Sequence, residues 1–183
     1  MRHFTPLFAA LALMLAAVAA SATDLDSDVI DRWADSMDEI EVWAQENEMS
    51  DADMTDPDDP TNLEASMSMA VSQNPSMQDI IEDYGFNDGD AWASTGARIV
   101  NAYGAVVMEE DPQAGSYEEM QQQMQAQLEQ LESDPNINEQ QLEMIREQAS
   151  GAMAMMERMA SAPEADKDVV RNNRGRLDQL FEQ

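Results

Sequence analysis

Apolar residues recur every three or four positions through most of this chain, and proline, glycine or aspartate separates one such run from the next. This spacing places apolar side chains on one face of a helix, because an α-helix has about 3.6 residues per turn. The first run lies between Asp26 and Glu48 and contains Val29, Trp33, Met37, Ile40 and Ala44. We therefore expect an all-α fold, a compact single-domain bundle of five or six short-to-medium helices over residues 23–183.

Polar residues at a fixed spacing mark the starts of three helices. In a capping box, a Ser, Thr or Asn side chain and a Glu or Gln side chain three residues later bond each other's free backbone amides. The pairs with this spacing are Thr61 and Glu64, Ser116 and Glu119, and Asn138 and Gln141. Gly85 is expected to end a helix, with Phe86 folded back onto it, because glycine readily adopts the left-handed backbone of a helix C-cap.

The segment from Asp88 to Glu110 is apolar on nearly all sides, which is typical of a buried helix. Its larger side chains are expected to share one face and are Trp92, Ile99, Tyr103 and Val107. Gly96 and Gly104 permit the close approach of a neighbouring helix. We expect this helix to be the most central one.

The first 22 residues have the three regions of a cleavable secretory signal peptide. Arg2 supplies a positive charge, and an apolar run extends from Leu7 to Ala20. Ala20-Ser21-Ala22 then provides the small residues that signal peptidase accepts. The apolar run has about 14 residues, fewer than the roughly 20 that cross a bilayer as a helix. We expect cleavage after Ala22 and a mature protein that is periplasmic or secreted, with no membrane insertion.

His3 is the only histidine, and the chain has no cysteine. Loss of the signal peptide would leave neither residue, which excludes His-dependent nucleophilic catalysis, ordinary zinc sites and disulfides. Paired carboxylates could still hydrolyse cell-wall glycan, but no pair stands out among 38 acidic residues. We expect a protein that is not an enzyme and has no cofactor, with a carboxylate-dependent cell-wall hydrolase as one alternative.

Acidic residues outnumber basic ones by 38 to 9, so the formal net charge is −29. This surface repels phosphate backbones, and we expect no nucleic-acid partner. Lys167 is the only lysine. Abundant Asp and Glu with so little lysine are typical of proteins from salty media, where salt screens the repulsion between like charges. We expect a halophilic or marine bacterial source, in which the acidity serves solubility.

Methionines gather near the end of the helix that Asn138 begins. Thioethers are soft ligands for Cu(I) or Ag(I), and the candidate ligands are Met153, Met156 and Met159. The other interpretation is that these methionines fill the core in the way that Leu and Ile do. A soft-metal-binding protein is therefore the second alternative function.

Met144 and Met155 lie roughly opposite the stripe of Leu142 and Ile145, at 100° per residue. Their helix therefore either packs on two sides or presents a flexible apolar strip to a partner. Together with Met159, these two methionines are our candidate surface for binding another envelope protein.

The basic residues Lys167, Arg171 and Arg174 are spaced to share one helix face. They are candidates for docking an anionic ligand or an acidic partner. The alternative is that they pair with acidic neighbours within the chain.

The segment Ile137-Asn138-Glu139-Gln140-Gln141 resembles the Leu-Thr-x-x-Gln motif of Spy-like periplasmic chaperones. Those proteins are small, exported, helical and independent of ATP, although their binding surface is basic. The resemblance covers five residues, two of them conservative replacements. It implies an envelope helper rather than an enzyme. We therefore expect a small exported acidic protein that acts as a binding or chaperone-like helper.

Overall fold

The fold is known from a computed structural model that describes residues 24–49, 62–111, 115–133 and 137–181. Every regular element in these ranges is a helix, which confirms the all-α prediction. The helices are α1 (Ser27–Glu46), α2 (Leu63–Gln73), α3 (Pro75–Asp83), α4 (Gly89–Glu110), α5 (Tyr117–Glu132), α6 (Glu139–Ala160), α7 (Glu164–Asn172) and α8 (Arg174–Phe181). The expected signal peptide lies outside the described residues.

The described ranges hold eight helices, so the predicted count of five or six is wrong. Two asparagines account for breaks between short helices. Asn74 separates α2 from α3, which then begins at Pro75. Asn173 separates α7 from α8, and its side-chain amide donates to the Val169 carbonyl at 2.8 Å and to Ser27 Oγ at 2.9 Å. Asparagine favours such breaks because its amide offers the backbone local alternatives to helical hydrogen bonds.

Two of the three predicted capping boxes are present at the helix starts where we expected them. The capping boxes predicted at Ser116 and Asn138 are both formed. Helix α2 begins differently, because Asn62 caps it by accepting the Ala65 amide at 3.1 Å. Thr61, which we expected at that position, lies outside the described residues.

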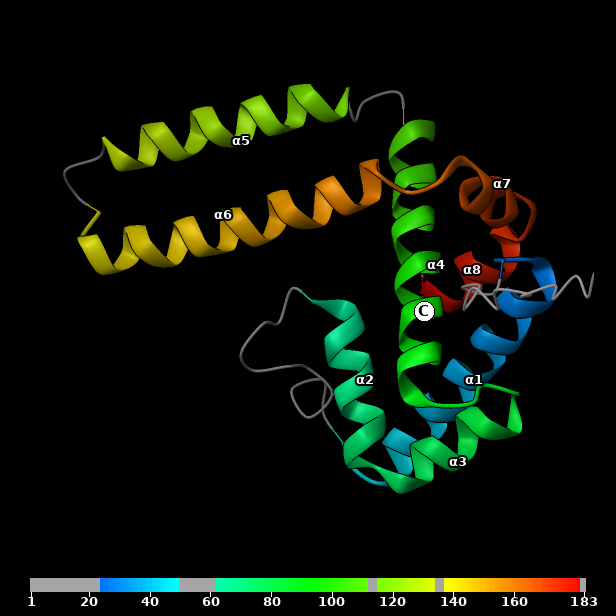
Figure 1. The fold of residues 1–183 in the computed structure, drawn as a ribbon. Coiled ribbons are helices and arrows are strands. Elements are labelled where there is room, and N and C mark those ends of the chain that lie inside the picture. The colour runs from blue at the N-terminus through cyan, green and yellow to red at the C-terminus, as the bar shows by residue number, and fades with distance from the viewer. Residues whose placement is uncertain (1–23, 50–61, 112–114, 134–136, 182–183) are drawn as a thin grey trace, which may run out of the picture.

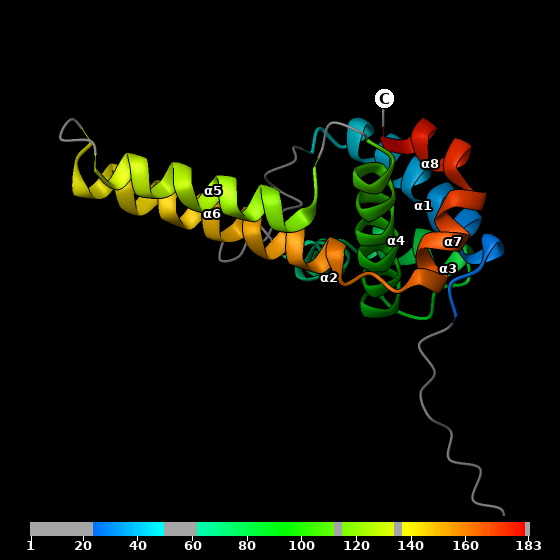
Figure 2. The ribbon, with the colours of Figure 1, turned by 90° about the horizontal axis from the view of Figure 1, so that it is seen from above.

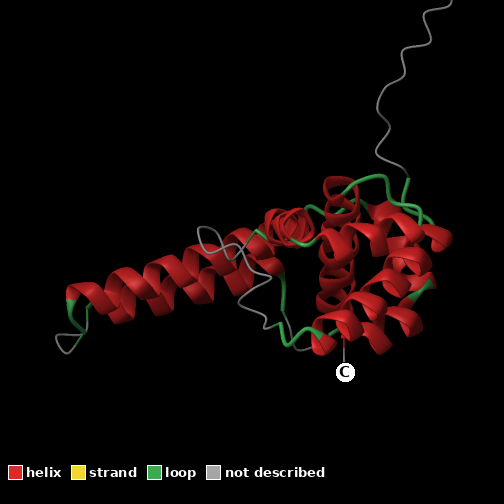
Figure 3. Cartoon of the chain, turned by 90° about the horizontal axis from the view of Figure 1, so that it is seen from below, coloured by secondary structure: helices red, strands yellow, loops and turns green. Residues whose placement is uncertain are grey.

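Helix α4 stands at the centre of the molecule and packs against α1, α2, α3, α6 and α7 (Figure 1). Seen from above, α1, α3, α7 and α8 gather on one side of α4, while α5 and α6 extend away from the other side (Figure 2). The view from below shows the same antiparallel pair projecting from the body (Figure 3). The body therefore consists of six helices, and the α5–α6 hairpin departs from the compact bundle that we expected.

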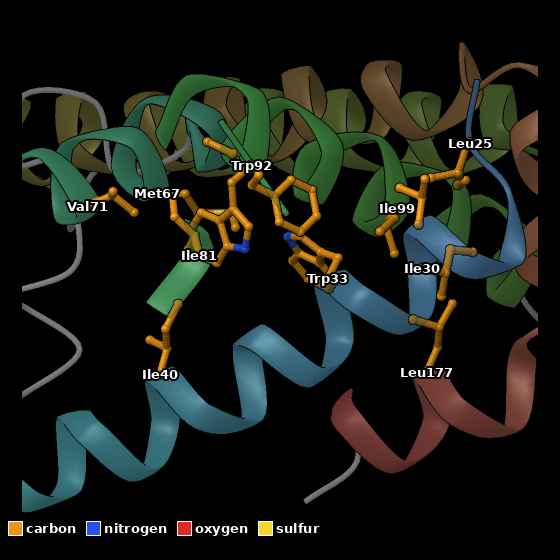
Figure 4. Packing of buried hydrophobic residues seen from close by; sticks show 14 of the residues in the cluster. Leu25, Ile30, Trp33, Ile40, Met67, Val71, Ile81, Trp92, Ile99 and Leu177 are labelled. Atoms are coloured by element: carbon orange, nitrogen blue, oxygen red, sulfur yellow. The ribbon is translucent and has the colours of Figure 1, made fainter. Parts of the chain in front are cut away.

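The core of the body is built around two tryptophans, Trp33 of α1 and Trp92 of α4, whose ring centroids lie 6.3 Å apart (Figure 4). Trp92 Nε1 donates to Ser36 Oγ at 2.8 Å, and this hydroxyl donates to the Trp33 carbonyl at 2.7 Å. Both tryptophans and Ser36 are buried. The two rings are thereby held in one arrangement at the junction of α1 and α4.

The buried face of α4 differs by one position from our prediction. Trp92, Ile99 and Val106 are buried and recur every seven residues, about two helical turns. Val107, which we placed on this face, is 36% exposed because it lies about 100° further around the helix.

Candidate functional site

The α5–α6 hairpin is held together by a seam of apolar side chains that is only half-buried. None of the described residues of either helix is buried. The half-buried apolar residues include Met120, Met124, Leu128 and Leu131 of α5, and Leu142, Ile145, Ala149, Met153, Met156 and Met159 of α6. An Arg146–Glu132 ion pair of 2.7 Å also joins the two helices. Two helices alone cannot enclose a core, so the seam remains partly accessible.

The outer side of α6 presents two methionines to solvent. Met144 is 57% exposed and Met155 is 43% exposed. They are eleven residues apart, close to three turns, so they share one line along α6 and lie roughly 16 Å apart. The sequence left two possibilities for this helix, and in the structure both methionines are exposed and not packed on a second side. Met159, the third residue of the candidate surface, is half-buried and lies against α4.

A hollow of about 260 Å³ lies at the root of the hairpin, where α4, α5 and α6 meet. Three methionines from three helices line it: Met108, Met120 and Met159. Tyr117 also lines it, and burial raises the pKa of the Tyr117 hydroxyl, with a smaller contribution from the charge of Glu157. The hollow therefore combines soft sulfur atoms with a phenol that stays protonated.

The methionines that we proposed as metal ligands are distributed differently. Met153 lines a separate hollow nearer the hairpin tip, together with Leu128 and Arg146. Met159 instead shares the root hollow with Met108 and Met120, which are far from it in sequence. Sequence reasoning missed this grouping because spacing within one helix does not show what a neighbouring helix contributes. Among the described residues, no cluster of three or more His, Cys, Asp or Glu is placed to hold a metal ion.

The predicted basic cluster faces the acidic end of α4. Lys167 Nζ lies 2.6 Å from Glu109 Oε1 and also pairs with Glu164. Arg171 reaches the other Glu109 oxygen at 2.6 Å. The hydrogen bond from Lys167 holds the pKa of Glu109 below its ordinary value, and the hydrogen bond to Glu109 raises the pKa of Lys167.

Arg174 continues this pattern at the junction of α7 and α8. Its Nη1 lies 2.9 Å from Glu110 Oε2, and its Nε pairs with Asp178. The guanidinium also lies over the ring of Tyr103, 4.9 Å from the centroid. Acidic residues are unfavourable at a helix C-terminus, and these basic side chains offset that cost for α4. The geometry thus matches the second interpretation of the cluster, pairing within the chain.

The body contains an apolar cavity of about 450 Å³ that sequence analysis did not anticipate. Its walls come from α1, α2 and α8, and Trp92 of α4 and Met77 of α3 also contribute. Sequence spacing could not reveal this cavity, because its apolar lining residues have the same helical periodicity as residues that fill a core.

Comparison of the chain with protein-family models, curated proteins and solved structures finds no match in any of the three. Within the described ranges, no helix has the length and apolarity needed to span a bilayer. The features of the described structure that could bind another molecule are the exposed hairpin, the hollow at its root and the apolar cavity of the body.

Proposed function

We propose that this chain is a non-enzymatic binding protein of the bacterial envelope and that the α5–α6 hairpin contacts its partner. The observation that carries the proposal is the exposure of Met144 and Met155 on a helix that projects from the body. Methionine suits this role because its flexible, polarizable side chain adapts to different apolar surfaces.

The charge of the hairpin indicates which partner it accepts. Helices α5 and α6 contain eight glutamates and two arginines, a net charge of −6. An amphipathic segment with an apolar stripe flanked by lysine or arginine complements both the methionines and the charge. The apolar stripe of such a partner would contact Met144 and Met155. The surrounding glutamates of α5 and α6 would attract its basic residues and so increase its association rate.

The test uses three synthetic helical peptides: an amphipathic Lys/Leu peptide, a scrambled peptide of the same composition, and a Glu/Leu counterpart. Fluorescence anisotropy measures their affinity for the protein at two salt concentrations. We expect the amphipathic basic peptide to bind at least tenfold more tightly than the other two. The Met144→Glu/Met155→Glu variant should lose that advantage, whereas Met144→Leu/Met155→Leu should keep it.

The matched control is Val42→Glu, which places a charge at an exposed apolar residue of α1. It should bind the amphipathic peptide as the parent does. Equal binding of the scrambled peptide would show that charge alone is being measured and would contradict the proposal. So would full affinity in the Met144→Glu/Met155→Glu variant.

The location of the protein is part of the proposal and rests on the N-terminal sequence alone. We propose that the mature chain begins at Thr23 and lies in the periplasm or outside the cell. Mass spectrometry of the protein from fractionated cells tests this. A cytoplasmic chain that retains Met1 would contradict it.

Soft-metal binding is the second candidate function, because Met108, Met120 and Met159 line one hollow. Thioethers favour Cu(I) and Ag(I), and a ligand that binds only the folded state raises the melting temperature. We expect Ag(I) to raise the melting temperature of the parent protein. The Met108→Leu/Met120→Leu/Met159→Leu variant should show no such rise. Met153→Leu/Met156→Leu is the control and should respond as the parent does. If Ag(I) raised the melting temperature of both variants equally, the proposal of a soft-metal site in this hollow would be wrong.

A further inference from the structure

The apolar cavity of the body is a second place at which the molecule can bind a ligand, and it is independent of the hairpin. It measures about 450 Å³, within the range of small-molecule sites. Glu41 and Gln45 of α1 are its only polar lining residues among those described, and the remainder are apolar. Leu63 and Phe181 line it and are each 38% exposed, so they mark its mouth.

The inner wall of the cavity is rigid. Trp92 is buried and fixed by its hydrogen bond to Ser36 Oγ. At the mouth, the Phe181 ring lies against the buried ring of Trp33, with ring centroids 6.4 Å apart. These aromatic contacts present a preformed apolar surface, which reduces the entropy cost of binding.

The other walls are adaptable because methionines form much of them. Met37 of α1, Met67 of α2 and Met77 of α3 line the cavity, as does Met49, which follows the end of α1. Unbranched thioether side chains fill irregular spaces and adjust to the shape of an apolar guest. A rigid floor with adaptable walls suits an alkyl or aryl tail more than a polar molecule.

The charge around the cavity determines the head group. Glu41 is the only titratable residue in the described lining, and its Oε1 accepts a hydrogen bond from Gln45 Nε2 at 3.0 Å. Glu41 is exposed, so its carboxylate lies on the solvent side of the apolar lining. An anionic head group would be repelled here, whereas an ammonium group would be attracted.

We propose that this cavity binds the apolar tail of a small cationic amphiphile, with its ammonium group beside the Glu41 carboxylate. Burial of the tail supplies most of the affinity, and the exposed carboxylate supplies the preference among head groups.

Isothermal titration calorimetry tests the proposal with three ligands that share a ten-carbon chain: decyltrimethylammonium, decanol and decanoate. Each is kept below its micelle concentration or, for decanol, below its solubility limit. We expect the ammonium ligand to bind roughly fivefold more tightly than decanol, the range of an exposed ion pair. Decanoate should bind most weakly. Glu41→Gln should remove the preference for ammonium over decanol, while Glu46→Gln, an exposed position of α1 outside the lining, should preserve it.

Two further variants test the tail site. Ala70→Leu fills the cavity from α2, and Leu63→Trp narrows its mouth at a position that is 38% exposed. Each should weaken binding of all three ligands at least fivefold. The hairpin variant Met144→Glu/Met155→Glu should bind them as the parent does.

Three results would overturn the proposal. The first is decanoate binding as tightly as the ammonium ligand. The second is an equal effect of Glu41→Gln and Glu46→Gln, which would indicate bulk charge and no local site. The third is unchanged binding in folded Leu63→Trp together with loss of binding in the hairpin variant, which would place the ligand on α6.

Discussion

The sulfur of Met159 in α6 lies beside Gly104 in α4, where a Cβ on residue 104 would stand 2.7 Å from it. Real Cβ atoms essentially never come so close to another heavy atom. Glycine therefore lets the two helices meet at this point, and the contact joins the root of the hairpin to the body.

Replacing Gly104 with alanine should show the cost of that contact. Alanine is favoured over glycine in a helix by about 0.5–1 kcal/mol. Gly175→Ala in α8 should realise part of this gain, because nothing lies within 4 Å of the added Cβ. Gly104→Ala should realise less of it, because the Met159 side chain must shift away from the added Cβ. Urea unfolding of both variants measures the difference in the free energy of unfolding.

The double variant Gly104→Ala/Met159→Ala separates helix propensity from crowding. It should be more stable than the sum of the two single changes predicts, since the clash disappears with the Met159 side chain. If Gly104→Ala alone stabilises the protein as much as Gly175→Ala does, Met159 of α6 does not pack closely against residue 104 of α4.

A two-point ion pair fixes α7 to α4. Arg98 Nη2 lies 2.8 Å from Asp166 Oδ1, and Arg98 Nε lies 3.1 Å from Oδ2, with Asp166 buried. Asp166→Asn should lower the free energy of unfolding by about 1–2 kcal/mol, because charge-assisted hydrogen bonds in part-buried sites are worth more than exposed ones. Glu132→Gln breaks the exposed pair with Arg146 and should cost less than about 0.5 kcal/mol. Equal costs in urea unfolding would contradict the assigned burial.

The Ser36 hydroxyl is the acceptor for the buried Trp92 indole. Ser36→Ala should cost about 1–3 kcal/mol, because it leaves that N–H without its partner. The near-ultraviolet circular dichroism of the tryptophans should change as well. Ser72→Ala removes an exposed hydroxyl that donates only to the local Met69 carbonyl and should cost much less. A silent Ser36→Ala variant would show that this hydrogen bond does not order the rings.

The sequence predicted well those features that depend on neighbouring residues. Gly85 ends α3 with φ of +81°, and the Phe86 amide donates to the Ile81 carbonyl at 3.0 Å, as expected of a glycine C-cap. Phe86 is buried against the core. Such motifs are closed by residues within one or two turns, so local spacing is sufficient to find them.

Features that depend on distant residues were not predictable from the spacing. The seam of α5 and α6 has the same periodicity as a core helix, and the pattern does not show whether one neighbour or several cover it. Lys167 pairs with the nearby Glu164, but its other partner, Glu109, is 58 residues away. With so many carboxylates in the chain, charge alone could predict pairing but could not identify the partner.

Salt should stabilise this protein. With a formal net charge of −29, repulsion between carboxylates opposes folding, and the Debye length falls from about 30 Å at 0.01 M salt to about 3 Å at 1 M. The melting temperature should therefore rise with NaCl. Neutral sucrose should raise it without the same steep dependence at low concentration. A melting temperature that falls as NaCl rises would mean that the ion pairs outweigh the repulsion.

Acid should weaken the contact between α8 and its neighbours. Hydrogen bonds from Arg174 and then from Tyr103 hold the pKa of Asp178 below its ordinary value of 3.8. A carboxylate with a lowered folded-state pKa stabilises the fold above its unfolded pKa, and that contribution is lost as the pH falls through the folded value. Asp178→Asn should therefore be less stable than the parent at pH 7, and the gap between them should narrow as the pH falls below about 4. Asp79→Asn, at an exposed position of α3, should track the parent throughout. Urea unfolding at several pH values measures the gap between the parent and Asp178→Asn. A gap that does not narrow below about pH 4 would show that the ionised carboxylate is not the stabilising group.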